Sequence, residues 1–205
     1  VSHLIHIDGD LADTVAKGLG LPLPEPAKAA VAPKTDLPPS DALSILKNGP
    51  QSFAGRKLGL LVSDGADAAL VKALMSAVED AGAMCEVVAP KIGGATLSDG
   101  TMLPAQQKID GGPSVLYDAV AVILSDEGAA MLAKDAPSKD FVADAFAHCK
   151  FLGLSPQAEP LLVKAGIAED LDDGCLGLES ADDAKAFVAA LAPLRFWDRE
   201  SVKQD

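Results

Sequence analysis

From residue 56 to residue 200, short apolar runs alternate with longer amphipathic stretches. The apolar runs predict buried strands at residues 57–63, 84–89, 117–124 and 150–154. The amphipathic stretches predict helices at residues 67–81, around residues 139–148, and after Ser180. Strands that alternate with helices are typical of βαβ units, so we expect a mainly parallel sheet covered on both faces.

Turn and capping residues mark the ends of these elements. Gly82 follows the first predicted helix, as expected at a helix C-terminus. Asp99-Gly100, within GGATLSDGTMLPA, predicts the turn of a hairpin. Ser180 and Asp183 have the spacing of a capping box, which predicts the start of the last helix at Ser180.

The first twenty residues have apolar side chains at helical spacing: Leu4, Ile7, Leu11, Val15 and Leu19. This pattern predicts one helix over residues 1–20 that stops at Gly20, although Gly9 and Gly18 weaken it. A lone helix of this length is marginally stable in water. Its apolar stripe therefore needs a partner, inside or outside this chain.

The next segment, residues 21–55, holds seven of the fourteen prolines. Dense proline removes backbone donors and fixes extended geometry, so we predict a linker here, with one short helical turn at residues 41–47. We place the folded domain at residues 56–200 and a tail at residues 201–205. The fold class is α/β: a doubly wound, flavodoxin-like sandwich preceded by a helix and a Pro-rich arm.

Composition adds to this picture. The 205 residues are 49% apolar with a mean hydropathy of +0.22, which is enough for a real core. Aromatic residues make up only 4%, so Ala, Val and Leu must build most of it. The net charge of −13 disfavours binding to nucleic acid and to anionic lipid. We expect neither as a partner.

The three cysteines, Cys85, Cys149 and Cys175, form no CxxC pair and do not suggest a disulfide framework. They favour a reducing compartment, and we expect a cytoplasmic protein. No apolar run is long enough to span a membrane, and VSHLIHIDGD does not resemble a signal peptide. Because this start already has a helical pattern, we expect the chain to begin within a longer protein.

The stretch CKFLGLSPQAEP, residues 149–160, raises the question of a nucleophile. Many α/β hydrolases hold one between a strand and a helix in the motif G-x-S-x-G, but here the motif reads G-x-S-x-Q. Ser155 followed by Pro156 also fits a helix N-cap with proline at the first helical position, and we favour this interpretation. His148 precedes the strand and Ser155 follows it, so about 20 Å of extended chain separates them.

Other chemistry has less support. His3, His6 and Asp10 could share one helical face, but no cluster supports a metal site there. No P-loop motif occurs, and the turn at residues 63–67 has one glycine and two carboxylates, which would repel a phosphate. Binding of FMN is therefore not expected despite the fold.

The cysteines also lack the surroundings of a reactive thiolate, which needs nearby positive charge or a helix N-terminus. Cys85 is next to Glu86 in a predicted strand, and Cys175 follows two aspartates that would raise its pKa. Cys149 has Lys150 beside it but lies at the wrong end of its strand for an elbow. We expect all three to be unreactive.

Several segments, taken in order, resemble the C-terminal domain of large-subunit haem catalases, which is similar to the DJ-1/PfpI class of glutamine-amidotransferase-like domains. They are GRKLGLLVSDGAD, GGATLSDGTMLPAQQKIDGGPSVLYDAVAVIL, HCKFLGLS and FVAALAPLRFWDR. The second is the most specific, with its DGT-x-LP and PS-x-x-YDAV. Upstream, residues 1–20 resemble the last helix of a catalase core, and residues 21–55 resemble the tether that follows it.

The resemblance implies a site without its reactive group. DJ-1/PfpI enzymes place a cysteine at the elbow and an acid after the first strand. Here the elbow falls at Pro156, or at Gln157 in a shifted register, and the acid falls near Asp67. We therefore expect no catalytic, cofactor-binding or metal-binding residues in this chain.

The resemblance also concerns haem. The parent enzyme disproportionates hydrogen peroxide with haem, and its haem-ligating tyrosine, distal histidine and asparagine lie upstream of Val1. Tyr117 belongs to the PS-x-x-YDAV motif and is not a haem-ligand candidate. We expect haem in the parent core and no cofactor in this fragment.

Three hypotheses follow. The favoured one is a non-catalytic accessory domain that packs against the catalase core in a tetramer, stabilises the assembly and borders a route to the haem. The second is a chaperone-like module that binds unfolded client proteins. The third is a free-standing DJ-1/PfpI-like enzyme that uses Cys149, Cys175 or Ser155.

Overall fold

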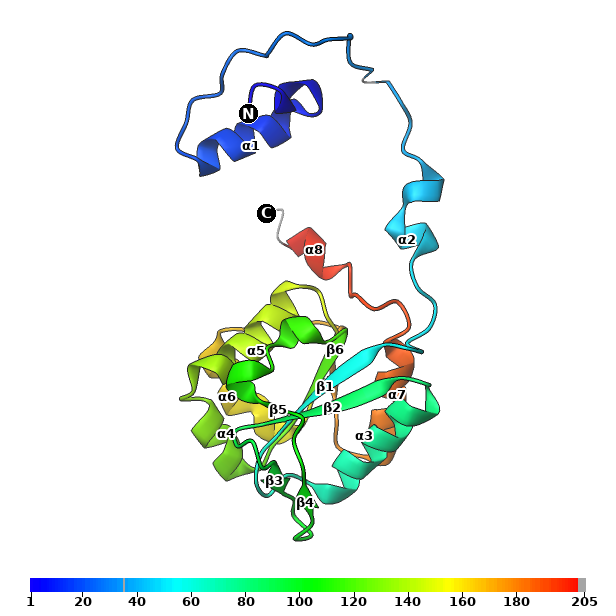
Figure 1. Cartoon of the computed structure of the whole chain (residues 1–205), viewed down its shortest axis with the longest axis vertical. Helices are drawn as coiled ribbons and strands as arrows, with labels where there is room; N and C mark the ends of the chain where they lie inside the picture. The colour runs from blue at the N-terminus through cyan, green and yellow to red at the C-terminus, as the bar shows by residue number, and fades with distance from the viewer. Residues whose placement is uncertain (35, 203–205) are drawn as a thin grey trace. The chain divides into compact units, whose positions relative to one another are not determined.

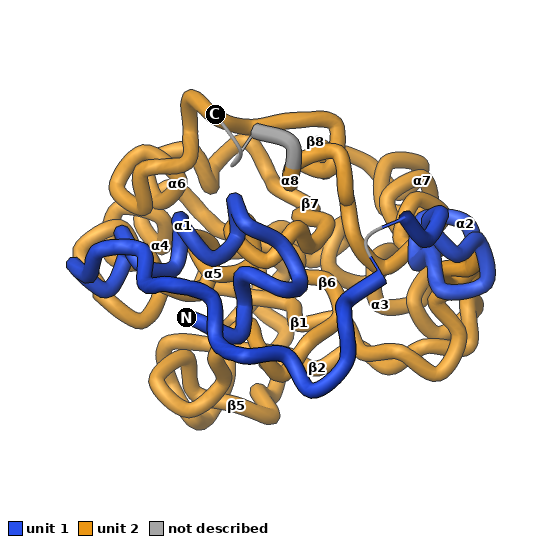
Figure 2. The backbone as a smooth tube through the Cα atoms, turned by 90° about the horizontal axis from the view of Figure 1, so that it is seen from above, with its two compact units in different colours: residues 1–47 blue, residues 48–205 orange. Residues whose placement is uncertain are grey.

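The computed structural model describes residues 1–34 and 36–202. The chain forms two compact units, Val1–Lys47 and Asn48–Asp205, which are coloured separately in Figure 2. Residue 35 of the predicted linker and residues 203–205 of the predicted tail lie outside the described residues.

Unit 1 begins with two helices where the sequence predicts one. They are the 3₁₀ helix η1 (Leu4–His6) and the helix α1 (Gly9–Gly18). The prediction is wrong at Asp8, which has extended geometry and accepts a hydrogen bond from the Leu11 amide at 2.9 Å. Aspartate is a strong N-cap, so it starts a new helix here. Gly20 ends the helical region as expected, with φ of +68°.

The Pro-rich segment of unit 1 returns to the first helix. The Ala27 amide donates to the Ser2 carbonyl at 3.1 Å, and a ring nitrogen of His6 donates to the Ala27 carbonyl. Further along, the predicted turn at residues 41–47 consists of the 3₁₀ helix η2 (Asp41–Leu43) and the helix α2 (Ile45–Asn48).

Large apolar side chains of unit 1 are exposed to solvent. The most exposed are Val31 at 82%, Leu43 at 87% and Ile7 at 77%. Others that are exposed are Leu11, Leu19, Leu21, Leu23, Leu37, Ile45 and Leu46. Only the small residues Ala12 and Ala16 of α1 are buried. Of the apolar stripe predicted for this region, Ile7, Leu11 and Leu19 are thus exposed, whereas Leu4 and Val15 are half-buried.

Unit 2 is built on a six-stranded sheet in the order β5-β2-β1-β6-β7-β8, in which all neighbouring strands are parallel. The strands are β1 (Lys57–Val62), β2 (Met84–Ala89), β5 (Gln107–Lys108), β6 (Ala119–Ile123), β7 (Leu152–Leu154) and β8 (Cys175–Gly177). Without the two-residue edge strand β5, the order is that of flavodoxin-like folds. A separate hairpin of β3 (Ala95–Thr96) and β4 (Met102–Leu103) encloses the predicted Asp99-Gly100 turn.

Helices cover both faces of this sheet (Figure 1). On one face, α3 (Ala68–Asp80) and α7 (Ala181–Ala190) pack on side chains such as Leu60 and Val62. On the other, α4 (Asp126–Leu132), α5 (Ala136–Ala147) and α6 (Glu159–Ala165) pack on side chains such as Leu61 and Val122. Successive residues of a strand point to opposite faces, and because both faces are covered, β6 is buried throughout and β1 at every residue except Lys57. This is the predicted doubly wound α/β sandwich.

Short helices complete unit 2. They are η3 (Ile109–Gly111), η4 (Ser114–Leu116), η5 (Pro156–Ala158) and α8 (Arg199–Val202). Ahead of β1, Phe53 is 4% exposed and belongs to the core shared by α3 and α7. In the described ranges, no helix combines the length and the apolar character needed to cross a membrane.

Arg199 fastens the last helix to three other segments of unit 2. Its Nε and Nη2 donate to the two carboxylate oxygens of Asp172 at 2.6 and 2.7 Å. Its Nη1 donates to the carbonyls of Phe146 and Lys150 at 3.0 and 2.8 Å. The guanidinium also lies 4.1 Å from the centroid of the Phe146 ring. Arg199 is only 3% exposed, and these acceptors replace the hydrogen bonds to water that its guanidinium loses on burial.

Gly153 in β7 provides a test of how closely the sheet packs. A Cβ at this position would lie 2.8 Å from Leu178 and 2.9 Å from Phe187, whereas a Cβ at Gly177 in β8 would meet nothing within 4 Å. We expect Gly153→Ala to lower the free energy of unfolding by about 1–3 kcal/mol. The matched Gly177→Ala should change it by less than about 0.5 kcal/mol. Urea unfolding followed by circular dichroism measures both, and equal losses would contradict close packing of Gly153 against Leu178 and Phe187.

Candidate functional site

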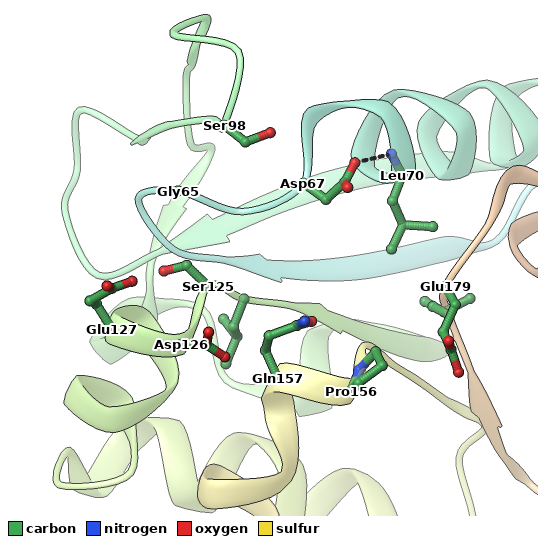
Figure 3. Close-up of a pocket in the computed structure, with 12 residues that line it drawn as sticks. Gly65, Asp67, Leu70, Ser98, Ser125, Asp126, Glu127, Pro156, Gln157 and Glu179 are labelled. Carbon is green, nitrogen blue, oxygen red and sulfur yellow. Dashed lines mark hydrogen bonds between the residues drawn. The ribbon is translucent and has the colours of Figure 1, made fainter.

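The candidate site is a cavity of about 490 Å³ at the carboxyl edge of the sheet (Figure 3). Its walls come from the segments that follow β1, β6, β7 and β8. The chain winds in opposite directions from β1 and β6, and ligands of open parallel sheets bind at such a switch point. The cavity is therefore where a doubly wound domain is expected to hold its chemistry.

Asp67, the expected acid position, lines this cavity but serves as a helix cap. Its carboxylate accepts a hydrogen bond from the Leu70 amide at 2.8 Å, which satisfies one free donor at the start of α3. Ser125 has the same role for α4, since its hydroxyl accepts from the Gly128 amide at 3.0 Å. Sequence reasoning did not single out Ser125, although a serine followed by Asp126 and Glu127 is a recognisable helix start.

The elbow positions lie on the opposite wall of the cavity from Asp67 (Figure 3). Pro156 begins η5, with Ser155 between it and the end of β7, and Gln157 follows. The structure thus brings the two alternative elbow residues and the acid position into one cavity, as the resemblance implies. A proline ring and a primary amide are not nucleophiles.

Ser155 is buried and does not line the carboxyl-edge cavity. It is 3% exposed, and its hydroxyl oxygen accepts a hydrogen bond from the Leu124 amide at 3.3 Å. It is the N-cap residue of η5 with Pro156 at the first helical position, which confirms the prediction, although its side chain makes no capping hydrogen bond. The hydroxyl instead bonds to the Leu124 amide, which follows the end of β6. His148 lines a different cavity at the amino end of β7, so it cannot act as a base for Ser155.

Carboxylates dominate the charge of the cavity. Those that line it are Asp67, Asp126, Glu127 and Glu179, and none of its lining residues is Lys, Arg or His. Asp64, in the turn after β1, accepts hydrogen bonds from Lys91 and from the Thr96 amide, which lower its pKa and keep it ionised. A phosphate in this cavity would meet repulsion, in agreement with the expectation for the turn at residues 63–67.

None of the three cysteines forms a disulfide among the described residues, and all lie outside the elbow. Burial raises the pKa of Cys85 to about 12 and that of Cys175 to about 11. The pKa of Cys175 is raised as predicted, but burial is the main cause; of the two aspartates only Asp172 contributes, and its backbone hydrogen bond lowers the pKa while its charge and side chain raise it. Cys149 is 3% exposed and adopts a φ of +55° directly after α5, at the position where a glycine usually ends a helix.

The candidate metal and haem ligands do not assemble into a site. Across residues 1–34 and 36–202, no group of three or more His, Cys, Asp or Glu side chains could hold a metal ion. Among the histidines considered at the N-terminus, His6 binds the Ala27 carbonyl, whereas His3 is exposed. Tyr117 is buried, and its hydroxyl donates to Glu86 at 3.3 Å. Tyr117 therefore does not fit the role of a haem ligand.

The fold and the cavity define a doubly wound, flavodoxin-like α/β domain with no nucleophile at its elbow. Residues 54–201 match the family described as the C-terminal domain found in long catalases. The chain belongs to this family.

Relatives extend the similarity to almost the whole chain. Catalase C of Rhizobium meliloti is 54% identical over 205 residues, which cover 99% of this chain and 29% of the relative. Catalase HPII of Pseudomonas putida is 33% identical, with 98% of this chain and 28% of the relative covered. Catalase-B of Dictyostelium discoideum is 31% identical, with 97% and 28% covered. The chain thus spans less than a third of the length of these relatives.

Substitution of Asp67 separates a capping role from acid catalysis. Asparagine caps helices nearly as well as aspartate but cannot act as an acid. We expect Asp67→Ala to lower the free energy of unfolding by about 1 kcal/mol and Asp67→Asn to preserve most of it. Urea unfolding of the two variants decides this, because equal losses would mean that the charge matters more than the hydrogen bond to Leu70.

The raised pKa values of the thiols predict slow alkylation. At pH 7, Cys85 and Cys175 should react with iodoacetamide on the order of 100-fold or more slowly than in the unfolded chain. Their rates should still rise between pH 7 and pH 9, because the thiolate fraction grows toward the raised pKa. Site-resolved mass spectrometry, with the chain in urea as the control, measures this. A cysteine alkylated at pH 7 as fast as in urea would reopen the hypothesis of a thiol enzyme.

Proposed function

We propose that this chain is a non-catalytic accessory region of a long catalase, which contributes to the stability of the assembly and to substrate access. In this proposal a catalase core precedes it, holds the haem and disproportionates hydrogen peroxide in the cytoplasm. Residues 1–20 are the last helix of the core, residues 21–55 are the linker, and residues 56–200 are the accessory domain.

The exposure of apolar side chains in unit 1 carries the proposal. Leucine, isoleucine and valine side chains recur along this unit and remain exposed, which is unfavourable in water. The relatives are more than three times as long as this chain, so they have further chain that could cover such a surface. A catalase core is therefore the partner that we assign to unit 1.

The carboxyl-edge cavity supports the non-catalytic part of the proposal. The elbow positions hold Pro156 and Gln157, and the hydrogen bond to Leu70 engages Asp67 as a cap. The domain thus has the cavity that its fold class uses for reactive groups, but it has no nucleophile or free acid at the elbow and acid positions. A structural contribution to a larger catalase accounts for both features.

Deletion of residues 54–205 from the whole protein that carries this chain tests the proposal. We expect haem content and turnover per haem at saturating peroxide to be retained. The midpoint of thermal inactivation should fall by several degrees, because the packing that the domain supplies is lost. The Gly153→Ala variant of the whole protein is a milder counterpart. A loss of turnover per haem with unchanged thermal stability would contradict the proposal.

The same exposed side chains also suit a chaperone-like module, so that hypothesis needs its own experiment. The 205-residue chain is mixed at equimolar amounts with a heated, aggregating test protein, and light scattering is recorded. The control replaces Leu43 and Leu46 with serine, which removes apolar surface without touching unit 2. On the accessory-domain proposal, neither chain suppresses aggregation. Suppression by the natural chain alone would favour the chaperone-like function.

A further inference from the structure

A second cavity, of about 510 Å³, lies at the opposite end of the sheet from the candidate site. It is formed by the end of α5, the residues before β7 and the segment between α7 and α8. The lining side chains that matter here are Val115, Ala147, Lys150, Arg195, Trp197 and Glu200. Neither the family match nor the carboxyl-edge cavity accounts for this combination of cations and apolar groups.

Lys150 is a fixed cation in the wall of this cavity. Its side chain is 3% exposed, and its ammonium donates to the carbonyls of Ser114 and Tyr117 at the two ends of η4. Neutral carbonyls hold an ammonium in place without cancelling its charge. The charge is therefore held beside η4, and no carboxylate of the described residues is hydrogen-bonded to it.

Arg195 supplies a second cation to the same cavity. Its Nη1 donates to the carbonyls of Asp118 and Leu194, at 3.1 and 2.7 Å. Its Nε and Nη2 donate no hydrogen bond to any described residue, so their N–H groups can donate to a ligand. Burial, and to a smaller extent the positive charge of Arg195, lower the pKa of Lys150 to about 8.

Negative charge near the cavity offsets this lowering only in part. The negative charges of Asp118 and Asp144 raise the pKa of Lys150, but the net shift is still downward. Glu200 also lines the cavity, and its carboxylate accepts a hydrogen bond from the Cys149 thiol at 3.3 Å. An anion bound near Lys150 and Arg195 would relieve the remaining repulsion.

Apolar side chains also line the cavity, beside His148, Cys149 and Glu200. Trp197 presents an indole ring, and Val115 and Ala147 present aliphatic groups. Val115 is 72% exposed, so apolar surface continues out of the cavity. A ligand that satisfies both parts of the wall needs an anionic head and an apolar body.

We propose that this cavity binds a small organic carboxylate, with the carboxylate between Lys150 and Arg195 and the apolar body against Trp197. A carboxylate can accept two hydrogen bonds from a guanidinium, which Arg195 has free donors to provide. In a chain with a net charge of −13, this site concentrates positive charge in one place.

Trp197 is the only tryptophan of the 205-residue chain, so its fluorescence reports on this cavity alone. The probe is 3-phenylpropanoate, and the neutral control is 3-phenylpropanamide, which has the same ring and length. We expect a saturable fluorescence change at millimolar concentrations with the carboxylate and a much weaker response with the amide. Absence of a saturable change, or equal binding of the amide, would overturn the proposal.

Three variants locate the effect. Arg195→Gln should weaken binding on the order of 10-fold or more, because it removes one of the two cations. Glu200→Gln should tighten binding, because it removes a competing negative charge from the wall. Lys91→Gln makes the same charge change as Arg195→Gln but pairs with Asp64 at the other end of the sheet, so it should have no effect. Circular dichroism checks folding, and if Arg195→Gln does not fold, Glu200→Gln decides the outcome, since unchanged affinity there would contradict the site.

The pH dependence gives an independent readout. As the pH rises from 7 to 9, Lys150 passes through its pKa of about 8 and loses its charge. The other titratable groups around Lys150 are Arg195, Asp118 and Asp144, together with His148, Cys149 and Glu200 of the cavity wall. We therefore expect weaker binding at pH 9 than at pH 7 in the natural chain. Affinity that stays constant over this interval would show that Lys150 does not contact the anion and would overturn the proposed geometry.

Discussion

Burial of the parallel sheet on both faces is the constraint on which the rest of unit 2 depends. Strand β1 is buried almost throughout because Leu60 faces α3 and α7 while Leu61 faces the opposite layer. To cover a parallel sheet, each helix must return the chain from the carboxyl edge to the amino edge. Helix N-termini therefore gather at the carboxyl edge, and their free amides require acceptors. Here Asp67, Ser125 and Ser180 provide them, so the edge where related folds hold reactive groups is occupied by caps.

The sequence pattern predicts the sheet well where the strands are long and apolar. Strand β2 begins and ends at the predicted residues, and β1 and β6 lie within their predicted ranges. The short edge strands β5 and β8 were not predicted, because two or three residues show no periodicity and pair only when a neighbouring strand is in place. The break at Asp8 illustrates the reverse case, in which one local hydrogen bond overrides an otherwise regular apolar spacing.

The candidate site was predictable in location but not in detail. The resemblance named Pro156, Gln157 and Asp67, which the fold brings to one cavity. The hydroxyl of Ser155 could not be placed from sequence, because its partner is the Leu124 amide on another strand. The second cavity was harder still, since Lys150 becomes a buried cation only after η4 and the segment that carries Arg195 close around it. Burial of a charge depends on tertiary contacts that composition and spacing do not encode.

The contacts of Arg199 bear on the order in which the domain acquires its structure during synthesis. Arg199 follows every strand of unit 2 in the chain, yet it supplies hydrogen bonds to the end of α5, to the start of β7 and to the loop before β8. While the ribosome is still making the last helices, the backbone carbonyls and the Asp172 carboxylate that Arg199 later engages must remain solvated. Completion of the β8 edge is thus coupled to the emergence of Arg199 from the exit tunnel. Premature termination before Arg199 would leave a domain with all of its strands but without the side chain that holds this edge together.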